Sequence, residues 1–94
     1  MKERISKSFP LGQVVITSNA QQKLNLVDAF CFVSRHLCCD WGDLCDEDWA
    51  LNNAAVLSGE GRIFSSYTDS NDVKFWIITE HNNEYTTVLL PEDY

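Results

Sequence analysis

The sequence predicts a single α+β domain in which a short N-terminal strand and three helices precede a three-stranded antiparallel β-meander. Three observations lead to this prediction. The hydrophobic period changes from helical to alternating near Gly61, the expected helices follow one another directly, and turn-forming residues separate the last three strand candidates. The chain of 94 residues suits one core. We expect residues 1–10, which have mixed charge and no hydrophobic period, to form a mobile arm before a domain over 11–94.

The first strand and helix are short. Residues 13–17 are mostly β-branched, which is typical of a strand. Ser18 is followed three residues later by Gln21, a pattern of helix N-termini, so a short helix is predicted over 19–24.

The second helix has the clearest helical pattern and is expected to end near 36–39. Its predicted buried face repeats at intervals of three or four residues and consists of Leu26, Ala29, Phe30, Val33 and Leu37.

A third helix is predicted over 47–57, capped by an aspartate in the stretch Asp46–Asp48 and stopped by Gly59. Its expected inner side consists of Leu51, Ala54, Ala55 and Ser58.

Alternating residues then predict strands over Arg62–Thr68, Val73–Glu80 and Tyr85–Leu90. The segments between them, 69–72 and 81–84, are rich in turn-forming residues. Both faces of the central strand are partly apolar, which predicts that it is covered on both sides or lies in an interface.

Charge limits the classes of function. The chain has 14 acidic and 7 basic residues, and residues 24–94 contain thirteen acidic against three basic ones. Such a body repels phosphate backbones, so we expect no direct nucleic-acid binding and favour a protein partner with a basic surface. Solubility is the alternative reason for the acidity. No apolar stretch suits a membrane span or signal peptide, so we expect a cytoplasmic protein without membrane contact.

The cysteines do not predict a metal site. Cys31, Cys38, Cys39 and Cys45 contain no C-x-x-C pair, although three of them lie near His36 in the sequence. The acidic stretch 40–48 also departs from the pattern of a calcium-binding loop. We therefore expect free thiols, no metal and no cofactor.

The junction between the second and third helices is the candidate binding site. The site consists of polar and aromatic residues of this junction and of the isolated arginine that follows the third helix. These residues are His36, Asp40, Trp41, Asp43, Asp48, Asn52 and Arg62. A histidine beside carboxylates has the chemistry of a general base. The alternative is an ordinary helix end followed by capping aspartates. No nucleophile accompanies the histidine, so no catalytic residue is assigned.

Two further assignments remain open between structure and function. Arg62 is expected to form a salt bridge with Asp40, Asp43 or Asp48, with anion binding as the alternative. The three tryptophans and two of the tyrosines belong either to the core or to an exposed aromatic patch of the kind found at interfaces. These aromatic residues are Trp41, Trp49, Trp76, Tyr67 and Tyr85.

Several segments appear in an order that resembles a known family. They read LGQVVIT, CDWGDL, GRIFSSYT, KFWIITE and TTVLLPEDY within residues 11–94. The chain resembles small uncharacterised "plasmid-related" proteins of bacterial mobile elements, some of which are labelled type I restriction modification subunits. That label is not supported, because the chain has no glycine-rich cofactor loop or N/D-P-P-Y segment. The chain departs from the family pattern at 81–84, where members usually have A-D-R-S, and at the pair Cys38–Cys39.

The predicted function is that of a small, non-enzymatic accessory protein of a mobile genetic element that acts by protein–protein binding. A narrower version is a DNA mimic with an anti-defence role. One alternative is a small enzyme or toxin that uses His36 with Asp40 or Asp43. Another is a structural protein that self-associates, for example as a homodimer.

Overall fold

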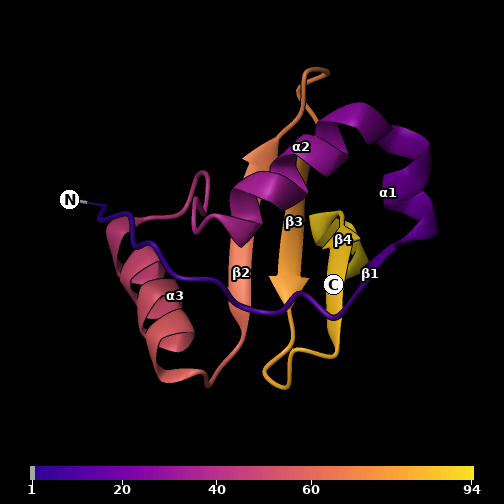
Figure 1. Cartoon of the computed structure of the whole chain (residues 1–94). Helices are drawn as coiled ribbons and strands as arrows, with labels where there is room; N and C mark the ends of the chain where they lie inside the picture. Colours follow the sequence, from indigo (N-terminus) through magenta and orange to yellow (C-terminus); the bar gives the residue numbers. More distant parts are fainter. Residues whose placement is uncertain (1) are drawn as a thin grey trace.

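The computed structural model describes residues 2–94, and in these residues three α-helices accompany a four-stranded mixed sheet (Figure 1). The α+β class is therefore confirmed. In chain order the elements are β1 (Gln13–Ile16), α1 (Ser18–Lys23), α2 (Leu26–Leu37), α3 (Asp46–Ser58), β2 (Ile63–Thr68), β3 (Lys74–Thr79), β4 (Tyr85–Leu89) and a 3₁₀ turn, η1 (Pro91–Asp93).

The strands lie in the order β1-β4-β3-β2. Strands β2, β3 and β4 pair antiparallel, as the two hairpin segments predict. Strand β1 joins β4 in parallel and makes the sheet mixed, a feature that goes beyond the predicted three-stranded meander. The register places Ser65, Ile77, Val88 and Ile16 in one row across the sheet. Ser65 in this row is hydrogen-bonded to His36 of α2, so the row belongs to the face of the sheet that α2 covers.

The buried face of α2 differs from the predicted one. Leu26, Phe30 and Leu37 are 44%, 74% and 40% exposed, whereas Ala29 is buried. The inward stripe instead includes Phe32, whose ring centroid lies 4.7 Å from that of Tyr67. The helix is rotated about its axis so that this stripe faces the sheet, because the aromatic and polar side chains of the stripe contact residues of the strands.

The predicted inner side of α3 is wrong in the same sense. Leu51 is 67% exposed, while Trp49, Asn52 and Val56 are the buried residues of this helix. Of the predicted set, Ala55 alone packs against the core, and it is partly buried. A tryptophan and a hydrogen-bonded asparagine thus decide which side faces inward, and the smaller apolar residues remain outside.

Capping residues also differ from those expected. Thr17, rather than Ser18, caps α1, because its side-chain oxygen accepts a hydrogen bond from the Ala20 N–H. Cys45, rather than an aspartate of the stretch Asp46–Asp48, occupies the cap position of α3, and it does so without a side-chain hydrogen bond. Gly59 ends α3 in the left-handed conformation (φ 75°), which confirms the predicted stop.

Residues 2–10 lie against the domain, and Met1 lies outside the described residues. Phe9 is buried in the core. Trp49 donates its indole N–H to the Glu3 carbonyl at 2.7 Å, and Asn53 donates to the same oxygen. Figure 1 shows this segment crossing the sheet on its way to β1. These contacts join residues 2–10 to the domain, and the mobility expected of the arm over 1–10 stays a prediction.

The free edge of β2 is covered by two segments. The Asn52 side chain donates to the Phe64 carbonyl and accepts from the Phe64 N–H. Its amide group thus makes the two hydrogen bonds that a backbone residue of a neighbouring strand would make. Beyond it, the loop at Gly42 forms a parallel bridge to Ser66. Gly42 has φ 75°, and a Cβ there would collide with the Ser66 carbonyl. This close approach requires glycine.

Replacing Asn52 with Ala removes both hydrogen bonds to Phe64 and leaves its backbone groups without those partners. We expect the free energy of unfolding to fall by about 3 kcal/mol, measured by urea denaturation. Leu51→Ala in the same helix is the matched control and should change it by less than about 0.5 kcal/mol. Equal effects of the two substitutions would contradict the role given to Asn52.

Candidate functional site

His36 lies near the C-terminal end of α2 and is completely buried. Its Nδ1 lies 2.5 Å from the Ser65 hydroxyl on β2, and its Nε2 lies 2.9 Å from the Thr79 hydroxyl on β3. Thr79 is hydrogen-bonded to Thr86 on β4, which donates to the Leu11 carbonyl. Burial lowers the pKa of His36 to about 3, because the charged imidazolium is poorly solvated in the core.

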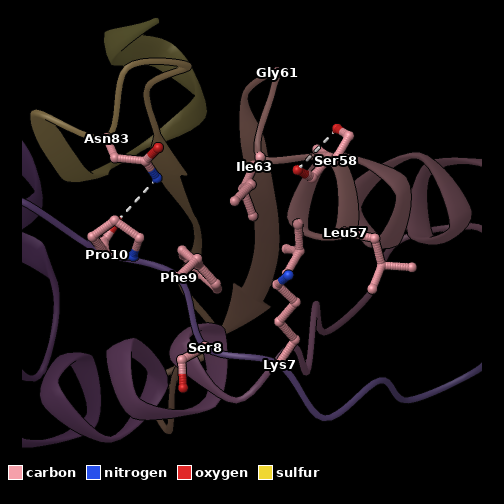
Figure 2. Close-up of a pocket in the computed structure, with 12 residues that line it drawn as sticks. Lys7, Ser8, Phe9, Pro10, Leu57, Ser58, Gly61, Ile63 and Asn83 are labelled. Carbon is pink, nitrogen blue, oxygen red and sulfur yellow. Dashed lines mark hydrogen bonds between the residues drawn. The ribbon is translucent and has the colours of Figure 1, made fainter.

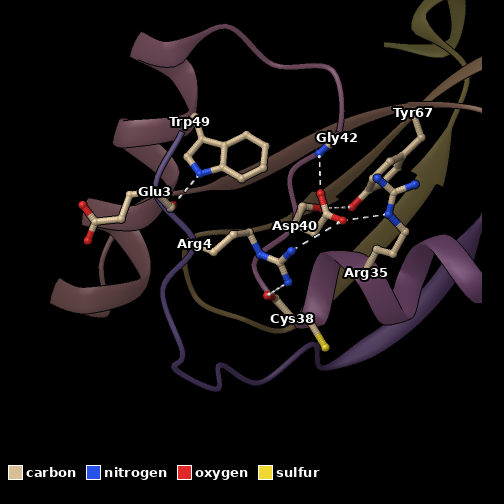
Figure 3. A network of polar contacts seen from close by, with 8 residues as sticks. All are labelled: Glu3, Arg4, Arg35, Cys38, Asp40, Gly42, Trp49 and Tyr67. Carbon is tan, nitrogen blue, oxygen red and sulfur yellow. Dashed lines mark hydrogen bonds and ion pairs between the residues drawn. The ribbon is translucent and has the colours of Figure 1, made fainter. Parts of the chain in front are cut away.

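Asp40 lies at the surface beside two arginines (Figure 3). Arg35 Nε donates to its carboxylate at 2.9 Å, and Arg4 lies 4.0 Å away on the other side. The Gly42 N–H donates to the second carboxylate oxygen. Partial burial by itself raises the pKa of Asp40, but the hydrogen bonds from Arg35 and Gly42 and the charge of Arg35 lower it below its usual value. Tyr67 donates its hydroxyl to the Asp40 carbonyl at 2.6 Å, which fixes the loop after α2.

The predicted pairing of His36 with Asp40 or Asp43 does not form. Both ring nitrogens of His36 are bonded to hydroxyl groups, while Asp40 is bound by arginine. Trp41 is completely buried, and its ring centroid lies 5.5 Å from that of His36. The junction is thus an ordered packing region, and its histidine serves to join α2 to the sheet.

The other predicted site residues are spread over different parts of the molecule. Asp43 and Asp48 are exposed, and Asn52 is buried against β2. Arg62 does not reach the aspartates of the junction. It pairs with Glu80 at 3.4 Å and donates to the Tyr94 hydroxyl at 2.7 Å. The predicted salt bridge of Arg62 to the acidic stretch is therefore wrong, because the pairing of β2 with β3 brings Glu80 to Arg62 instead.

The positions of the tryptophans show which candidate aromatic residues belong to the core and which are exposed. Trp41 and Trp49 are both buried in the core. Trp76 is half-buried on the other face of the sheet, where its ring packs against Phe64 and Tyr94. Only Tyr85, at 47% exposed, retains a substantially exposed ring among the candidate aromatic residues.

Several cavities lie between elements of residues 2–94. One of about 250 Å³ lies between the N-terminal segment, the end of α3 and the start of β2, and Figure 2 shows Phe9, Leu57 and Ile63 around it. Within residues 2–94, no three metal-ligating side chains gather. The four cysteines are free thiols, of which Cys39 alone is buried.

An apolar surface that the sequence did not predict lies on α2 and β1. We define the α2–β1 surface as Val14, Leu26, Val27 and Phe30, which are 44% to 74% exposed. A groove of about 240 Å³ runs beside it, with Ala29, Val33 and Val88 among its lining residues. The signal was present in the sequence, because α2 is apolar on more than one side and only one side can face the sheet.

In comparisons with known proteins, no family model, curated protein or solved structure matches this chain. Among residues 2–94, none of the helices has the length and apolar character needed to cross a membrane.

The buried His36 makes stability depend on pH. The unfolded chain binds a proton at His36 below its ordinary pKa of 6.5, whereas the folded chain resists protonation until about pH 3. The contribution of His36 to stability is therefore fully present above pH 6.5 and is lost as the pH falls towards 3. Between pH 7 and 5 we expect His36 to reduce the free energy of unfolding by about 2 kcal/mol, measured by urea titrations.

Two substitutions separate this effect from other titrating groups. His36→Gln should remove this part of the pH dependence, whereas His81→Gln at the exposed histidine should keep it. If His36→Gln does not fold, NMR of the His36 ring in the native protein provides the test. A ring that titrates near pH 6.5 would contradict the buried neutral state.

Proposed function

We propose that this protein acts by binding another protein through the α2–β1 surface, as an accessory protein of a mobile genetic element. The observation that carries the proposal is the exposure of Val27 and Phe30, at 73% and 74%, on a helix whose opposite side already packs on the sheet. Contiguous exposed apolar side chains of this kind mark interaction sites in folded proteins. The sequence resemblance supports the mobile-element context.

The apolar surface supports this proposal better than acidity alone. Several acidic side chains are engaged within the domain and are less able to imitate a regular phosphate array. Asp28 accepts from Ser70, Asp69 accepts from Asn25, and Glu80 pairs with Arg62. A DNA-mimic role would depend on the remaining acids, whereas apolar contact requires no such array. The acidic body then favours partners with basic residues around an apolar contact.

The environment of His36 also favours binding over the alternative of a small enzyme or toxin. A general base must reach the proton that it removes. His36 is completely buried, and hydroxyl groups occupy both of its ring nitrogens.

Affinity capture from a lysate of the native host tests the proposal. The wild-type protein, a Leu26→Ser/Phe30→Ser variant and a Leu51→Ser control are used as bait, and captured proteins are identified by mass spectrometry. Leu51 is an exposed leucine of α3, so the control loses exposed apolar surface outside the α2–β1 surface. We expect a partner retained by the wild type and the control and reduced about tenfold by the double variant, since removing two anchors weakens a contact by at least 1.4 kcal/mol.

The bound partner should dissociate more readily at high salt, because its basic groups face an acidic body. Circular dichroism confirms that each bait is folded. If no captured protein distinguishes the double variant from Leu51→Ser, binding through the α2–β1 surface is excluded.

A further inference from the structure

The two edges of the sheet are treated differently by the fold. The β2 edge is covered by Asn52 and by the loop at Gly42. No other strand pairs with the outer edge of β1 among residues 2–94, because β1 pairs with β4 alone. An open edge presents unpaired backbone donors and acceptors, and most proteins protect such an edge with charges, proline or a bulge. The strand Gln13–Ile16 carries no charge and no proline.

The register identifies the open backbone groups. Gln13 donates its N–H to the Glu84 carbonyl, and Thr17 donates to the Val88 carbonyl. Backbone groups alternate in direction along a strand, so the N–H and C=O of Val14 and Ile16 point away from β4. These groups can pair with an added strand.

The apolar groove lies beside the same edge. Val14 and Ile16 line one wall, and Leu26 and Phe30 of α2 line the other. A strand added to β1 would direct every second side chain to the helix-covered face, with about 7 Å between successive inward residues. Two such side chains would reach the groove, so backbone pairing and apolar burial would occur together.

Acidic residues stand at both ends of this edge. Glu84 follows the β3–β4 turn next to Gln13, is exposed, and forms no ion pair within residues 2–94. At the other end, Asp93 accepts a hydrogen bond from Thr17 at 2.6 Å. The hydrogen bonds from Thr17 and Asn19 lower the pKa of Asp93, so its carboxylate remains charged. The middle of the edge is uncharged and its ends are negative.

Taking the protein-binding function as given, we propose that β1 accepts an extended segment of the partner as a fifth strand, with alternating apolar side chains and basic residues at both ends. The apolar positions fill the groove beside Phe30, and the basic ends meet Glu84 and Asp93. A second copy of this chain fits less well, because antiparallel pairing of two β1 strands would bring Glu84 of one copy towards Asp93 of the other.

A synthetic peptide, Lys-Lys-Val-Thr-Ile-Thr-Val-Lys-Lys, tests the proposal on the full chain. Binding is measured by fluorescence anisotropy, and the site is mapped by amide NMR. We expect the amide signals of Val14 and Ile16 to shift most. A peptide with glutamates in place of the lysines should bind at least about tenfold more weakly, since two unlike-charge contacts become repulsive.

The variant Val14→Pro removes an outward N–H and leaves the bonds from Gln13 and Thr17 to β4 in place. It should weaken peptide binding about tenfold, whereas Val14→Thr keeps the N–H and should bind within about twofold of the wild type. Should Val14→Pro fail to fold, Phe30→Ser and its control Leu51→Ser give the same comparison, because both positions are exposed.

Three results of the peptide and sedimentation measurements would overturn strand addition. The first is equal peptide affinity of folded Val14→Pro and the wild type, or of folded Phe30→Ser and Leu51→Ser. The second is a set of NMR shifts confined to elements other than β1 and α2. The third is sedimentation showing a wild-type dimer that Val14→Pro converts to a monomer, which would assign the edge to a second copy. A lysate partner that depends on Phe30 but tolerates Val14→Pro would keep the binding function and exclude only the added strand.

Discussion

The buried imidazole of His36 is the interaction on which the rest of the structure depends. It joins α2 to Ser65 on β2 and Thr79 on β3, and the chain of hydroxyl groups continues through Thr86 to the carbonyl of Leu11. One helix, three strands and the segment before β1 therefore share a single buried network. Such a network is stabilising only when every member has a partner, and within residues 2–94 no buried side-chain nitrogen or oxygen lacks one.

This network also explains which side of α2 reaches solvent. A helix has one rotation about its axis that brings His36 to its two hydroxyl partners, and Phe32 follows on the same side to meet Tyr67 and Phe75. The opposite side then carries Leu26, Val27 and Phe30 outward. The exposed apolar surface is thus a consequence of polar recognition in the core, where hydrogen bonding takes precedence over hydrophobicity.

Local patterns in the sequence were sufficient for the α+β class and the glycine stop of α3, and they predicted the sheet only in part, because β1 adds a parallel fourth strand to the meander. They failed where a long-range partner decides the outcome. The helical period of α2 fits more than one face, and the choice between them rests on Ser65 and Thr79, which lie far away in the sequence. Arg62 was matched to the wrong acid for the same reason, because strand pairing brings Glu80 to it. The candidate site was predicted as a cluster around His36, but burial of that ring depends on packing that periodicity alone does not specify.

The parallel pairing of β1 with β4 has a consequence for the order of events during synthesis. Residues 13–16 pair with residues 85–88, so the first strand of the chain has no neighbour in the sheet until the last strand exists. Contacts this distant in sequence close late, since a long loop must be ordered before they form. A nascent chain in which β4 is still held in the ribosome therefore lacks the finished edge at β1, which exists only once residues 85–88 have emerged and paired.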